Sequence, residues 1–137
     1  KHIGVSAFDI DQIKEAQKYS PYPIVANQLK YSLWKKSDLD TISYCQKNNI
    51  MVIVYKLFGR GKLATNKIPF IGELSQKYNK TEAQIILNWV IAKENMVALF
   101  KSTDIKHLEE NKNIFGFTLT EKEKSKIDSL VPSLNEE

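Results

Sequence analysis

The sequence predicts an α/β fold built from consecutive βα units around a parallel sheet. Four short apolar runs rich in β-branched residues recur along the chain, and a segment with helical periodicity follows each of them. Runs of this length that are continuously apolar suit parallel strands buried on both faces. Strands that alternate with amphipathic helices indicate βα units. The expected strands are residues 3–6, 24–27, 51–54 and 96–100.

The first helical segments have recognisable ends. Asp9 can cap the first helix, and Gln12 stands three positions later as its capping-box partner. The second helix is expected from about residue 38 to residue 48. Pro69 suits the first turn of a third helix, which Asn79 ends.

Three further helices are expected in the second half of the chain. Thr81 with Gln84 forms a second capping box and opens a helix with a strongly apolar face. Another helix begins near Asp104, after the fourth strand. Thr120 and Glu123 form a third capping box, which predicts a helix near the end of the chain.

Four βα units in 137 residues amount to half of a (β/α)8 barrel of the TIM type, which typically needs about 250 residues. An open doubly wound sheet is the alternative. It normally carries a Gly-rich turn after its first strand, and Ser6-Ala7-Phe8 is no such turn. We therefore expect residues 1–137 to form a single half-barrel unit. The chain starts at Lys1 without an initiator Met, so we expect a fragment of a longer barrel.

Composition narrows the range of functions. The formal charge is +4, but Arg60 is the only arginine and the lysines are spread among acidic residues, so no nucleic-acid partner is expected. Cys45 is the only cysteine and sits in an apolar pattern, which predicts a buried thiol in a reducing compartment. No apolar run approaches a membrane span and no signal peptide is visible, so we expect a cytoplasmic protein without a metal site.

Five segments resemble motifs of the aldo-keto reductase family, in the same order. They are IGVSAF at 3–8, NQLKYS at 27–32, YKLFGRG at 55–61, TEAQIILNW at 81–89 and KSTDIKHLEEN at 101–111. The matches cover nearly the whole chain. The resemblance implies the C-terminal half of the barrel, strands five to eight. It also places each strand-end motif at the edge where barrel enzymes hold their sites.

In that family this half supplies most of the cofactor-binding surface, so the resemblance implies a site for NADP(H), with NAD(H) as the alternative. Ser6 and Gln28 match the ligands of the nicotinamide carboxamide, which needs both donors and acceptors. Tyr55 matches the aromatic residue on which the nicotinamide ring stacks.

The next matching segment is the loop that folds over the pyrophosphate in the family. Lys56, Leu57, Gly59 and Arg60 belong to it. Gly59 and Gly61 would permit a close approach of the backbone. A lysine at position 56 could attract a phosphate.

The last matching segment resembles the part of the family that binds the adenosine end. Lys101 and Ser102 match the pair that holds the 2′-phosphate, a cation and a hydroxyl before a helix. His107 stands where the family often has Arg. Glu110 and Asn111 match residues that contact the adenine.

Each of these residues also has a plainer interpretation. Ser6 and Gln28 could satisfy loop backbone groups, and Tyr55 could be an aromatic residue of the rim. Residues 101–102 could form a charged turn before a helix cap, with His107 on the surface. The prediction of a cofactor site comes from their occurrence together at one edge of the sheet.

The sequence departs from the family pattern in three places. Ala7 replaces the usual Asn and removes an amide from the carboxamide site, a loss of about 1–3 kcal/mol where a partner stays unsatisfied. Lys56 and Leu57 replace Ser-Pro, and Leu99 and Phe100 replace Ile-Pro. We therefore expect a divergent site.

The family's proton donor is a Tyr assisted by Lys, Asp and His, all on the first half of the barrel, so no catalytic residue is assigned in this chain. We expect an oxidoreductase fragment whose complete enzyme transfers hydride from NADPH to an aldehyde or ketone. Its partner is then the N-terminal half. The alternative is a stand-alone half-barrel that self-associates as a non-catalytic NADPH-binding or structural module, because two open sheet edges invite pairing.

Overall fold

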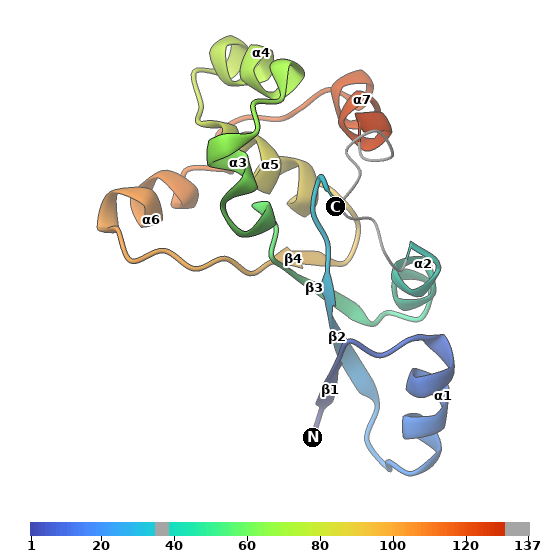
Figure 1. The fold of residues 1–137 in the computed structure, drawn as a ribbon. Helices are drawn as coiled ribbons and strands as arrows, with labels where there is room; N and C mark the ends of the chain where they lie inside the picture. Colours follow the sequence, from blue (N-terminus) through green and yellow to red (C-terminus); the bar gives the residue numbers. More distant parts are fainter. Residues whose placement is uncertain (35–38, 131–137) are drawn as a thin grey trace.

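The computed structural model describes residues 1–34 and 39–130, apart from the side chain of Arg60. Its centre is a parallel sheet in which the strands lie in chain order, β1-β2-β3-β4 (Figure 1). The strands are β1 (Ile3–Ser6), β2 (Ile24–Lys30), β3 (Met51–Tyr55) and β4 (Met96–Ala98). The α/β prediction and the four strand positions are thus confirmed. β2 is longer than predicted and β4 is shorter.

Helices connect and follow the strands. They are α1 (Ile10–Lys18), α2 (Leu39–Lys47), the short turns η1 (Gly59–Gly61) and α3 (Lys62–Thr65), α4 (Pro69–Tyr78), α5 (Glu82–Ile91), α6 (Ile105–Lys112) and α7 (Glu121–Leu130). η1 and α3 were not predicted, because a loop with two glycines carries no helical periodicity. The expected start of the second helix at residue 38 lies outside the described residues.

The predicted helix ends are confirmed where the structure describes them. The Asp9 carboxylate accepts a hydrogen bond from the Gln12 backbone N–H at 2.8 Å. The Gln12 side-chain oxygen accepts one from the Asp9 backbone N–H. Thr81 and Gln84 form the same box at the start of α5, and Thr120 and Glu123 form it before α7. Pro69 is at the first position of α4, and Asn79 ends that helix in the left-handed conformation.

The two faces of the sheet differ in burial. Val52 and Val54 of β3 are fully buried under the helices, whereas Met51 of the same strand is 41 % exposed. On β4, Val97 is 43 % exposed. We call the helix-covered side the outer face and the other side the inner face. The prediction that both faces are buried is therefore wrong, because the described residues place no side-chain layer against the inner face.

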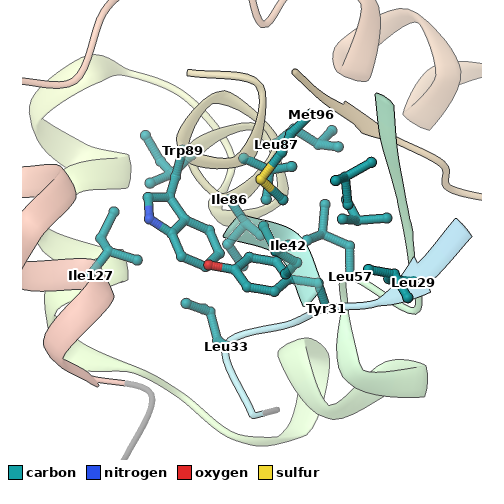
Figure 2. Packing of buried hydrophobic residues seen from close by; sticks show 14 of the residues in the cluster. Leu29, Tyr31, Leu33, Ile42, Leu57, Ile86, Leu87, Trp89, Met96 and Ile127 are labelled. Atoms are coloured by element: carbon teal, nitrogen blue, oxygen red, sulfur yellow. The ribbon is translucent and has the colours of Figure 1, made fainter. Parts of the chain in front are cut away.

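The core lies between the outer face and the helices. α5 runs through it, with Leu87 and Trp89 fully buried. The ring of Trp89 stacks on Tyr31 with centroids 5.4 Å apart, and Ile127 of α7 lies close by (Figure 2). Burial raises the pKa of the Tyr31 hydroxyl, and the nearby Asp128 carboxylate adds to the shift. Tyr31 is thus a structural residue of the core.

Cys45 also belongs to this core and is fully buried, as its apolar pattern predicts. Burial raises the pKa of its thiol. A buried thiol of this kind is a poor nucleophile. No helix in the described part of the chain is long and apolar enough to cross a membrane.

Candidate functional site

The ends of the strands bring the predicted polar side chains to one edge of the sheet. Ser6 is the last residue of β1 and pairs in register with Gln28 of β2, so both lie on the inner face. Tyr55 ends β3 and pairs with Lys30, two positions beyond the row of Gln28. Because all strands are parallel, these carboxyl ends share one edge.

Two adjoining cavities follow this edge. The first has a volume of about 680 Å³. Its lining residues are Gln28, Tyr55, Lys56, Leu57, Phe58, Gly61, Leu99, Phe100 and Lys101. The second, of about 460 Å³, continues toward α5 and α6. Phe58, Gly61 and Lys101 line both cavities, so the pair forms one elongated space along the strand ends.

The two glycines of the loop after β3 have different reasons to be glycine. Both have positive φ, 60° at Gly59 and 95° at Gly61. A Cβ on Gly59 would lie 2.6 Å from the ring of Trp34, so that position is set by packing. A Cβ on Gly61 would meet no atom within 4 Å, because this residue faces the shared part of the cavities. Gly61 is therefore the position where a ligand could approach the backbone closely.

Cationic and polar groups line the second cavity at the start of α6. Lys101 and His107 are exposed, and Ser102 is half-buried. The Ser102 hydroxyl donates to the Asp104 carbonyl and accepts from the Asp104 N–H, both at 3.1 Å. Asp104 in turn caps α6 by accepting from the Lys106 N–H at 2.8 Å. Residues 101–104 therefore form a polar turn before a helix cap, as the plainer interpretation predicts, and Lys101 and Ser102 also line the cavity.

The Asp104 carboxylate also lies beside the cationic end of the site. Its Oδ2 is 4.0 Å from Nδ1 of His107. Lys106 and Glu110 form a second contact of this kind, at 3.9 Å. An anion bound by Lys101 would therefore meet a mixed field, because Glu82 and Glu110 line the same cavity as Lys101 and His107.

The remaining predicted residues of this end come from α6. Glu110 and Asn111 both line the second cavity, and Asn111 is buried. The Gln84 amide donates to the Glu110 backbone carbonyl at 2.6 Å, which ties α6 to α5. This contact positions the two residues relative to the cavity wall.

Two strand ends adopt a conformation that non-glycine residues rarely take. Ala7, after β1, has φ 58°, and Lys56, after β3, also has φ 58°. The turn at Ala7 lets its N–H donate to the Gln28 carbonyl at 2.9 Å. The buried Asn27 amide holds the same turn by donating to the Phe8 carbonyl at 2.8 Å. Positive φ in ordinary residues concentrates at functional edges of folds.

The structure gathers most of the predicted site residues around the two cavities. Ser6 and Gly59 are outside the lining; Ser6 is on the exposed inner face beside Gln28, and Gly59 packs on Trp34. The side chain of Arg60 lies outside the described residues. Leu57 lines the first cavity but is 2 % exposed and belongs to the core. Sequence reasoning missed the apolar lining, namely Phe58, Leu63, Ala64, Ala83 and Phe100, because such residues look like ordinary core positions.

The residues present fit an extended dinucleotide. Gln28 offers an amide donor and acceptor beside the aromatic ring of Tyr55 at one end, and Ser102 and His107 line the other end. Lys101, a cation that can bind an anion, and Gly61 line the part that the two cavities share. Among the described residues, no group of His, Cys, Asp and Glu could hold a metal ion.

Comparisons with known proteins identify the family of this chain. The sequence model of the Aldo/keto reductase family matches residues 1–132. The chain is 31% identical to an NADPH-dependent alpha-keto amide reductase of Saccharomyces cerevisiae, over 95% of the chain and 44% of the relative. It is 28% identical to glyoxal reductase of Bacillus subtilis, over 93% of the chain and 45% of the relative.

Solved structures show the same relationship. A thermostable aldo-keto reductase, Tm1743, has a TM-score of 0.83 at 32% identity, covering 94% of this chain and 48% of that protein. An aldo-keto reductase of the silkworm Bombyx mori, AKR2E5, solved with NADPH, has a TM-score of 0.80 at 27% identity, covering 94% of this chain and 42% of that protein. The chain spans about half the length of the relatives it matches. It belongs to the aldo/keto reductase family.

Proposed function

We propose that residues 1–137 are one unit, the half of a cytoplasmic NADPH-dependent oxidoreductase that holds the cofactor. This half would comprise strands five to eight of the barrel. The complete enzyme transfers a hydride from NADPH to an aldehyde or ketone. One observation carries the proposal: the elongated cavity has an amide and an aromatic ring at one end, a hydroxyl and a histidine at the other, and a lysine in the part that the two cavities share. The relatives that are reductases using NADPH support it.

Each residue has a defined task in this proposal. Gln28 and Ser6 orient the carboxamide, and Tyr55 supports the flat face of the nicotinamide ring. Lys101 and Ser102 bind the 2′-phosphate. The bound cofactor supplies the hydride. This half of the barrel orients the ring and leaves the proton donor to the other half.

A binding titration tests the cofactor assignment. NADPH fluorescence should change on addition of the chain, and Lys101→Met should weaken NADPH binding about tenfold because a charge-assisted contact is lost. NADH binding should change much less, because NADH lacks the 2′-phosphate. Lys112→Met is the matched control, since Lys112 is an exposed lysine at the end of α6, the helix that follows Lys101, and lies outside the cavity lining. If NADPH does not bind at millimolar concentration, the proposal fails.

An activity assay tests the division of labour. The chain alone should not oxidise NADPH in the presence of aldehydes or ketones, even under conditions where NADPH binds. Turnover by the isolated chain would show that it contains its own proton donor. That result would overturn the assignment of the chemistry to the other half.

A second candidate function follows from the open inner face. Met51, Val97 and Leu99 are 41–50 % exposed there, and β1 and β4 are edge strands among the described residues. A second copy of the chain could cover this face and close the ring without restoring the proton donor. Light scattering over a range of concentrations tests this: a monomer at all concentrations would exclude it, and a dimer would support it.

A further inference from the structure

Two amide side chains of α5 hold the segment that forms one wall of the second cavity. Gln84 donates from Nε2 to the backbone carbonyl of Glu110 in α6 at 2.6 Å. Asn88, one turn further along α5, donates from Nδ2 to the carbonyls of Ile114 and Phe117 at 2.9 and 3.0 Å. Both amides are buried. Of these three acceptors, only Glu110 belongs to the lining of the cavity.

The Gln84 side chain also closes the capping box of α5. Its Oε1 accepts from the backbone N–H of Thr81 at 2.9 Å, and the Gln84 N–H donates to the Thr81 hydroxyl at 3.2 Å. Residues 81–83 line the second cavity from α5, and Glu110 and Asn111 line it from α6. The two ends of one amide therefore bind two walls of the same cavity, although Gln84 is not among its lining residues.

We propose that Gln84 is a positioning residue of the cofactor site, because its hydrogen bonds set the separation of the α5 and α6 walls between which the adenosine end of the cofactor lies. This inference rests on the proposed function, since it assumes that the adenosine end occupies the second cavity. A ligand held from two sides loses affinity when one side shifts, because its contacts can no longer form together. Gln84 acts on the ligand through Glu110 and Asn111 and does not touch it.

The competing role for Gln84 is stability alone. A capping-box residue stabilises the start of its helix, and a buried amide stabilises the packing of two helices, whatever the cavity binds. The two roles give different results in the folded protein. If Gln84 serves stability alone, its variants unfold more easily but bind with unchanged affinity while folded. If Gln84 positions the walls, the affinity of the folded variants falls.

Calorimetric titrations of the full chain with NADPH and with adenosine 2′,5′-bisphosphate test the proposal, at a temperature where circular dichroism shows each variant to be folded. Gln84→Met removes the hydrogen bond to α6 and the capping contact without adding a charge. Gln84→Glu removes the amide donor but keeps the capping acceptor, because glutamate also serves in the box. Each variant should raise the Kd of both ligands by about three- to tenfold, the range expected for one lost hydrogen bond.

Gln12 offers the matched control. It closes the capping box of α1 as Gln84 closes that of α5, and its Oε1 accepts from the Asp9 N–H at 2.9 Å. Gln12 is exposed and lies outside the lining of both cavities. Gln12→Met and Gln12→Glu should leave both dissociation constants unchanged. Gln12→Met still loses a capping contact, so it shows whether weaker capping by itself changes binding.

Added salt separates a displaced wall from a new charge. Gln84→Glu places a carboxylate near a cavity that Glu82 and Glu110 already line, and this charge would repel the phosphates of the ligands. Salt screens such repulsion, but it does not restore the position of a wall. The loss of affinity in Gln84→Glu should therefore persist at high salt and match the loss in Gln84→Met.

The outcomes separate the inference from the function on which it rests. Unchanged dissociation constants in Gln84→Met, or a failure of both Gln84 variants to fold, would leave Gln84 a residue of stability alone and overturn the inference. A loss in Gln84→Met alone assigns the effect to capping, and a loss that salt removes assigns it to charge; both results contradict the proposal. If the wild type binds neither ligand, the proposed function fails and the inference with it. Equal losses in both Gln84 variants, with none in the Gln12 variants, support it.

Discussion

Alternate residues of the same strands form the outer and inner faces of the sheet, and the two faces differ in burial. Leu29, Val52 and Val54 point to the helices and are 0–2 % exposed. Met51 and Val97 point away from them and are 41 % and 43 % exposed. The side chains that stabilise the chain by burial therefore lie on the helix-covered side of the sheet. Among the described residues, the inner face stays partly exposed.

The largest expected change in the free energy of unfolding comes from truncating a leucine of the core. Leu87→Ala should destabilise the chain by about 2–5 kcal/mol, because the side chain is fully buried in α5. Leu99→Ala is the matched change on the inner side, where the side chain is 50 % exposed, and should cost less than about 1 kcal/mol. Urea unfolding followed by circular dichroism measures both. Equal costs would show that the inner face is covered in solution.

A smaller effect is expected where a carboxylate joins two helices of the outer layer. Glu123 of α7 accepts hydrogen bonds from Lys77 at 2.6 Å and Tyr78 at 2.7 Å, both in α4, and from Thr120. Glu123→Gln should destabilise the chain by about 1–3 kcal/mol, because these donors lose a charged acceptor. Glu121→Gln is the control on the same helix turn; its side chain is 88 % exposed, and it should change stability by less than about 0.5 kcal/mol.

The same carboxylate predicts a pH dependence. Burial acts to raise its pKa, but the hydrogen bonds from Lys77, Tyr78 and Thr120 outweigh burial and lower the pKa of Glu123 to about 2. A lowered pKa in the folded state means that the contribution is complete above the unfolded pKa of about 4.3 and is lost as pH falls toward 2. The stability difference between the wild type and Glu123→Gln should therefore narrow over this range. A constant difference would contradict the assignment.

The smallest effect concerns the strained edge of the inner face. Ala7 has φ 58°, so Ala7→Gly should stabilise the chain by about 0.5–1 kcal/mol by relieving the left-handed conformation. Ala26→Gly is the matched control in β2, a strand interior, and should destabilise by a similar amount of about 0.5–1 kcal/mol. Thermal unfolding of the two variants should shift in opposite directions. Shifts of the same sign would show that strain at Ala7 is not the cause.

Sequence patterns predicted the helix-covered layer better than the site. Asp9, Thr81 and Thr120 identify helix starts because capping depends on local chemistry that a short stretch of sequence contains. Burial of the inner face was wrongly expected for Met51 and Val97, because an apolar strand looks the same whether or not a second layer covers it.

The site itself was predicted by resemblance and not by local pattern. Gln28, Tyr55 and Lys101 are ordinary residues in isolation, and only the fold brings them to one pair of cavities. The packing of Gly59 against Trp34 had no signal in the sequence, because the two residues are far apart along the chain. The contact of Lys56 with the Tyr55 ring could not be predicted either, because nothing in the sequence indicates the positive φ of Lys56.

The order of the strands has a consequence for how the chain folds. Each strand pairs with the strand that follows it along the chain, so every pair of neighbouring strands is also consecutive in sequence. Folding rates rise when contacts are close in sequence, since less chain entropy is lost before each contact forms. The longest connection, between β3 and β4, carries α4 and α5, and α5 brings the most buried residues of the core. Addition of β4 is therefore expected to be the slow step, and the first three strands would form a template for it.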